Sequence, residues 1–102
     1  MIRKRLQMIL TPQELNRIVV RGSDDSLQIR VDAHGLTRAE ARMLINNVIL
    51  IPHTNFNLLV IHGFNHGTAI KEMLETDFDN GHILSHSVDP FNKGVTHMQI
   101  AA

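Results

Sequence analysis

The chain has 102 residues, which is enough for one domain with a single modest hydrophobic core. Its ten basic and ten acidic side chains cancel, so net charge does not indicate a strongly basic nucleic-acid binder, and such binding would need a local basic patch. The absence of cysteine excludes disulfides and thiolate metal sites and fits a cytoplasmic protein. No apolar run is long enough to span a membrane, and with only four phenylalanines and no tryptophan or tyrosine, stacking platforms for bases are scarce.

The first part of the chain, residues 1–25, is predicted to be an arm with a short helix, ahead of a domain at 26–102. Residues 1–10 carry a basic cluster and are predicted to form a solvated, frayed terminus. The TPQE pattern at 11–14 is a strong helix start, because threonine can cap the helix, proline suits its first position and glutamate completes a capping box. The apolar stripe that follows predicts a helix over about 12–21.

The rest of the chain is predicted to form an α/β fold, a two-layer α+β sandwich. Hydrophobic periodicity and turn signals predict strands over 26–32, 58–61, 82–88 and 95–100, and helices from a cap at residue 37 to about 50 and from about 68 to about 77. Strands separated by helices lie parallel and are joined by right-handed crossovers. The resulting β-α-β-α-β-β order predicts a mixed four-stranded sheet of order 1-2-4-3, with both helices on one face.

A glycine-containing turn joins the second predicted strand to the second helix. The apolar run at 58–61 is followed by HGFNHG at 62–67, and helical spacing resumes after it. A strand that turns into a helix in this way aims backbone N–H groups and the positive end of the helix dipole at one point, which favours a bound phosphate. Lys71, one turn into the helix, could hold the same phosphate, although an ordinary strand-to-helix loop would also explain the pattern.

Two distant segments should meet at one edge of this sheet. Asp32 and His34 follow the first predicted strand, and His62 follows the second. Ligands of parallel sheets bind just outside the carboxyl ends of the strands, and adjacent strands lie about 5 Å apart. We therefore expect a carboxylate, two imidazoles and an N–H-lined phosphate site to converge there.

The same segments resemble the two signature segments of the Smr (small MutS-related) domain family. Residues 31–37 read VDAHGLT and residues 61–63 read IHG, and the resemblance covers about 26–101. It departs from the family pattern in the turn, where Phe64 replaces the usual basic residue and two residues, Asn65 and His66, precede the next glycine.

The resemblance implies nucleic-acid binding, and often endonuclease activity that nicks DNA or cleaves RNA, including messenger RNA on ribosomes, as in DNA repair or RNA quality control. The catalytic residues would be Asp32, His34 and His62, and the phosphate-contacting residues Gly35, Gly63, Asn65, His66, Gly67, Thr68 and Lys71.

Two functional hypotheses other than endonuclease activity stay open. One is a non-catalytic module that docks on RNA, DNA or a ribosome, which the neutral net charge favours. The other is a histidine-rich zinc site, for which the sequence offers His82, His86 and His97, although these residues match no metal motif. The sequence specifies no cofactor, although it is compatible with a divalent metal ion at the site. It does not determine the oligomeric state.

Overall fold

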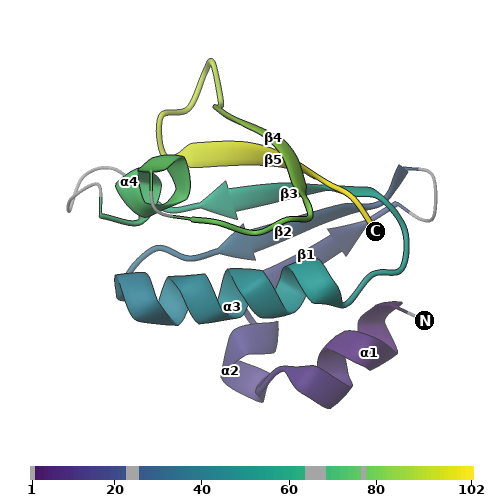
Figure 1. Cartoon of the computed structure of the whole chain (residues 1–102). Coiled ribbons are helices and arrows are strands. Elements are labelled where there is room, and N and C mark those ends of the chain that lie inside the picture. The colour runs from purple at the N-terminus through teal and green to yellow at the C-terminus, as the bar shows by residue number, and fades with distance from the viewer. Residues whose placement is uncertain (1, 23–25, 64–68, 77) are drawn as a thin grey trace.

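The computed structural model describes residues 2–22, 26–63, 69–76 and 78–102 (Figure 1). The chain forms a small α+β domain in which four helices and five strands share one core. The helices are α1 (Ile2–Ile9), α2 (Pro12–Leu15), α3 (Arg38–Leu50) and α4 (Ala69–Thr76). The strands are β1 (Ile18–Arg21), β2 (Gln28–Asp32), β3 (Phe56–Ile61), β4 (Ile83–Val88) and β5 (Val95–Ile100).

The strands form one mixed sheet of order β1-β2-β3-β5-β4. The pair β2 and β3, which α3 connects, is parallel, and the other three neighbouring pairs are antiparallel. The four-stranded sheet predicted from the sequence is therefore incomplete, because β1 adds a strand beside β2. The remaining four strands follow one another as β2-β3-β5-β4 in the observed sheet.

The predicted helix over 12–21 is wrong in its second half. The capping box of Thr11 and Glu14 forms, but α2 ends at Leu15 and the chain enters β1 at Ile18. The β-branched run that opens β1 pairs with the alternating strand β2, with Ile18 opposite Val31. Pairing with a neighbouring strand thus outweighs the local helical spacing, as is common for short apolar segments.

The N-terminal residues are also more ordered than predicted. Residues 2–9 form α1, and Leu6 is buried in the same core as β2 and β3. Leu10, just after α1, is buried there too. Residues 2–22 therefore pack as part of the fold.

The core lies on one face of the sheet. Alternate strand residues such as Ile29, Leu58 and Met98 are buried, together with apolar side chains from α1, α3 and α4. The intervening strand residues, such as Asn57 and Gln99, are exposed on the opposite face. Across the described ranges, no helix is long and apolar enough to cross a membrane.

Candidate functional site

The parallel pairing of β2 and β3 brings the two motif segments to one edge of the sheet. Asp32, the last residue of β2, lies opposite Ile61, the last residue of β3. The N–H of Ala33 donates to the carbonyl of Ile61 over 2.7 Å, which ties the two strand ends together. A Cβ placed on Gly63 would lie 3.9 Å from the Cβ of His34, so the segments are neighbours, as the topology predicted.

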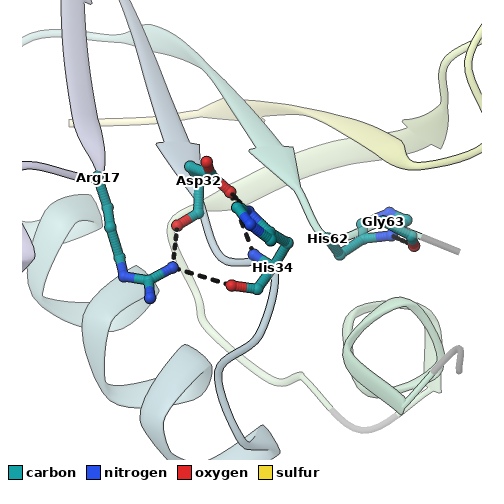
Figure 2. A network of polar contacts seen from close by, with 5 residues as sticks. All are labelled: Arg17, Asp32, His34, His62 and Gly63. Atoms are coloured by element: carbon teal, nitrogen blue, oxygen red, sulfur yellow. Dashed lines mark hydrogen bonds and ion pairs between the residues drawn. The ribbon is translucent and has the colours of Figure 1, made fainter. Parts of the chain in front are cut away.

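Asp32 and His34 form a close pair at this edge (Figure 2). Nδ1 of His34 is hydrogen-bonded to Oδ1 of Asp32, and the backbone N–H of His34 donates to the same oxygen over 3.2 Å. Because the carboxylate accepts the Nδ1 proton, the neutral ring carries its lone pair on Nε2. The side chain of His34 is 67% exposed and that of Asp32 is 39% exposed. His34 can therefore exchange protons with a ligand that arrives from solvent.

Arg17 secures the turn that carries this pair, and sequence reasoning did not single it out. Its Nη1 donates to the backbone carbonyls of Asp32, over 3.1 Å, and His34, over 2.9 Å. The backbone carbonyl of Arg17 also accepts the N–H of Asp32 over 2.8 Å. Figure 2 shows the guanidinium reaching across to both carbonyls. These contacts depend on where the chain enters β1, so no local motif could have revealed them.

The helix after the turn starts with a complete capping box. Thr37 caps α3, and the side chains of Thr37 and Glu40 each accept the other's backbone N–H. Hydrogen bonds from Thr37, chiefly from its backbone, lower the pKa of Glu40, and the positive charge of Arg17 acts in the same direction. Arg17 thus lies between two carboxylate-bearing segments, the end of β2 and the start of α3.

His62 is held inside the fold rather than presented to solvent. The residue is buried, and its Nδ1 donates to the carbonyl of Gly63 over 2.9 Å. Its Nε2 lies 2.8 Å from the hydroxyl of Thr96, which is fully buried in β5. Both ring nitrogens are therefore engaged within the protein. In this structure His62 anchors the end of β3 to β5, and its catalytic role stays a prediction.

The predicted phosphate-binding turn is described only at its two ends. Gly35 and Gly63 both adopt positive φ angles, of 80° and 72°. Lys71 lies in the first turn of α4 and is half-buried. The other residues predicted for this site, Asn65, His66, Gly67 and Thr68, lie outside the described residues.

Two of the three histidines considered for zinc, His82 and His97, have other partners. Nδ1 of His82 lies 3.1 Å from the carbonyl oxygen of Ala101, and Nε2 of His97 lies 2.6 Å from Oδ2 of Asp89. Within the part of the chain that the structure describes, no three His, Asp or Glu residues gather closely enough to hold a metal ion.

Comparison with known proteins adds no assignment. No family model, no curated protein and no solved structure matches this chain. Function is therefore inferred from the residues at the edge of the sheet.

Proposed function

We propose that the protein binds RNA or DNA and cleaves phosphodiester bonds at the edge formed by the ends of β2 and β3. The observation that carries the proposal is the exposed Asp32–His34 pair beside Gly63. A histidine whose Nδ1 is held by a carboxylate presents Nε2 as a general base near neutral pH. The likeness of residues 31–37 and 61–63 to the Smr signature segments supports the same activity.

In this reaction His34 transfers protons and Asp32 orients its ring. Nε2 of His34 accepts the proton of the attacking hydroxyl, which is water or, for RNA, a ribose 2′-hydroxyl. The attacking oxygen forms a bond to phosphorus, the bond to the leaving oxygen breaks, and that oxygen takes a proton from His34 or from water. Lys71 would stabilise the charge that develops on the phosphate, whereas the N–H of Gly63 is already donated to the carbonyl of Gly94.

The second candidate function is docking on nucleic acid, or on a ribosome, without cleavage. The internal hydrogen bonds of His62 favour it, because they leave His34 as the exposed imidazole at the described part of the edge. Efficient cleavage needs both a base for the nucleophile and an acid for the leaving group. One histidine can serve both steps only in succession.

A cleavage assay separates the two candidates. The full chain is incubated with labelled structured RNA, single-stranded RNA and supercoiled plasmid, with and without EDTA, so that metal dependence is measured as well. We expect His34→Ala to reduce cleavage by about 100-fold or more, and Asp32→Asn to reduce it too, since general acid–base catalysis is typically worth that much. His53→Ala, which removes an exposed histidine outside the site, is the matched control.

Each outcome decides between the candidates. Retarded migration on a gel without product would select the docking function, with binding that weakens steeply as salt rises. Cleavage that persists in both site variants would place the active centre elsewhere and reject the proposal.

A further inference from the structure

The sheet face opposite the core holds a shallow trough of hydrogen-bonding side chains. Neighbouring strand residues such as Leu58 and Met98 point into the core, so the residues between them point to this outer face. The trough crosses four strands and is lined by the amide, hydroxyl and imidazole side chains of Gln28, Asn57, Ser85, Ser87, His97 and Gln99.

Phe91 stands at one end of the trough and is 98% exposed. The carboxylate of Asp89 accepts the N–H groups of Phe91, over 2.8 Å, and Asn92, over 3.0 Å, and also contacts His97. The backbone that presents the ring is therefore held in place. Figure 1 shows the connection between β4 and β5 projecting away from α3. An exposed aromatic ring is the kind of surface on which unpaired nucleic-acid bases stack.

Two arginines lie on the same face as the trough. Arg21 pairs in register with Gln28, and Arg30 pairs with Leu59, so both side chains project to the outer side of the sheet. Described carboxylates on this face include Asp32, at the end of β2, and Asp89, which His97 contacts. The face thus offers guanidinium groups for phosphates and amide groups for base edges.

The trough and the candidate cleavage site are adjacent. The carbonyl of Gly94 accepts the N–H groups of His62, over 2.8 Å, and Gly63, over 3.1 Å. The connection that carries Phe91 therefore packs against the end of β3. A nucleic-acid strand held beside His34 and Gly63 could therefore extend past Phe91 and along the outer face of the sheet.

We infer that the trough binds an unpaired segment of nucleic acid, with one base stacked on Phe91 and neighbouring base edges bonded by the amide side chains. Amide groups can reach the pairing edges of bases only when the bases are not already paired. The inference rests on the proposed function, from which it takes nucleic acid as the class of ligand. It adds that the nucleic acid is single-stranded and lies over β5. It does not require that the strand be cleaved.

Fluorescence anisotropy of the full chain tests this. The probes are labelled single-stranded RNA and DNA oligonucleotides, duplexes of the same sequence, and unlabelled mononucleotides as competitors. Phe91→Leu keeps an apolar side chain but removes the stacking ring, and since Phe91 is 98% exposed, its thermal unfolding should match that of the unchanged protein. Met8→Leu, at a residue that is 85% exposed on α1, is the control.

We expect Phe91→Leu to weaken binding of the single strands by roughly 5- to 100-fold, the range reported for one stacked base, and Met8→Leu to leave it unchanged. The combined change Asn57→Ala and Gln99→Ala should also weaken it. Equal affinity of Phe91→Leu and unchanged protein, or preference for the duplex, would overturn the inference. Mononucleotides that compete as strongly as oligonucleotides would also overturn it, in favour of a free-nucleotide site.

The inference and the proposed function fail separately. Cleavage is scored on gels from the same mixtures. Single-strand binding that depends on Phe91 without any product supports the inference and rejects the catalytic proposal. Cleavage that depends on His34 but is indifferent to Phe91→Leu, with equal binding, supports catalysis and rejects the trough.

Discussion

The histidines of this protein differ in exposure and in hydrogen bonding because their neighbouring residues differ. His34 pairs with Asp32 and keeps most of its ring in solvent, whereas His62 is buried and hydrogen-bonded at both nitrogens. The first arrangement leaves a nitrogen for proton transfer with a ligand. The second uses the same ring as a structural crosslink between β3 and β5. Residue type alone therefore could not tell which imidazole of the two motifs faces a substrate.

The Asp89 carboxylate predicts a measurable pH dependence of stability. The hydrogen bond from His97, followed by that from the backbone of Phe91, lowers the pKa of Asp89 below its usual value of 3.8. Since the unfolded chain then binds a proton more readily than the folded one, acid favours unfolding. The stabilisation is complete above the usual pKa and is lost as the pH falls through the lowered, folded-state value.

Urea denaturation at a series of pH values from about 6 down to about 2 measures this effect. Asp89→Asn should lower the free energy of unfolding near neutral pH and reduce its decline in acid. Asp79→Asn, at an exposed aspartate between α4 and β4, serves as the control. An acid decline in Asp89→Asn as steep as in the unchanged protein would contradict the assignment.

At the scale of elements, β1 contributes to the candidate site by pairing with β2. It places Arg17 at the carboxyl end of β2, where the guanidinium holds the carbonyls of Asp32 and His34. The connection from β1 to β2 begins at Gly22, which has a φ of 72°. The left-handed backbone at Gly22 directs the chain out of β1, whose pairing with β2 positions Arg17 at the site.

Gly22→Ala should therefore destabilise the protein. A Cβ at this position would lie 2.3 Å from the backbone oxygen of Ser26, and the left-handed backbone alone costs a non-glycine residue about 1–2 kcal/mol. Gly81→Ala is the matched control, because a Cβ there meets nothing within 4 Å. Thermal and chemical denaturation of both variants would measure the difference, and equal stability would refute the role of the connection.

At the scale of the whole molecule, the N-terminal segment and the region from residue 26 onward share one core. Leu6 is 2% exposed and belongs to the same hydrophobic core as buried residues of the sheet and of α3 and α4. The sequence predicted a frayed terminus at residues 1–10, and it left open whether residues 1–25 are a partner-binding arm or an extension that packs on the domain. The structure instead has α1 covering part of the same apolar face that α3 covers.

Leu6→Ala tests this integration. Truncating a buried leucine costs about 2–5 kcal/mol, so the variant should unfold at a clearly lower urea concentration, in one transition for the whole chain. Met8→Ala, at an 85% exposed residue of the same helix, should change stability by less than about 0.5 kcal/mol. Similar unfolding of Leu6→Ala and the unchanged protein would mean that the segment is a dispensable arm.

Features that depend on neighbouring residues in the chain could be predicted from the sequence. The capping boxes at Thr11 and Thr37 form as expected, because their hydrogen bonds reach only three residues along the chain. The alternation over 26–32 correctly indicated the half-buried strand β2. The parallel crossover from β2 to β3 then followed, and with it the meeting of His34 and Gly63.

Features that depend on a distant partner were decided only by the tertiary structure. The run from Ile18 to Arg21 became a strand because β2 offered an unpaired edge, and α1 is anchored because Leu6 found apolar surface to cover. Arg17 and His62 likewise acquired their roles from atoms far along the chain, such as the carbonyl of His34 and the hydroxyl of Thr96. A short apolar or polar segment has several local conformations of similar free energy, so the contact that buries it or satisfies its hydrogen bonds selects one.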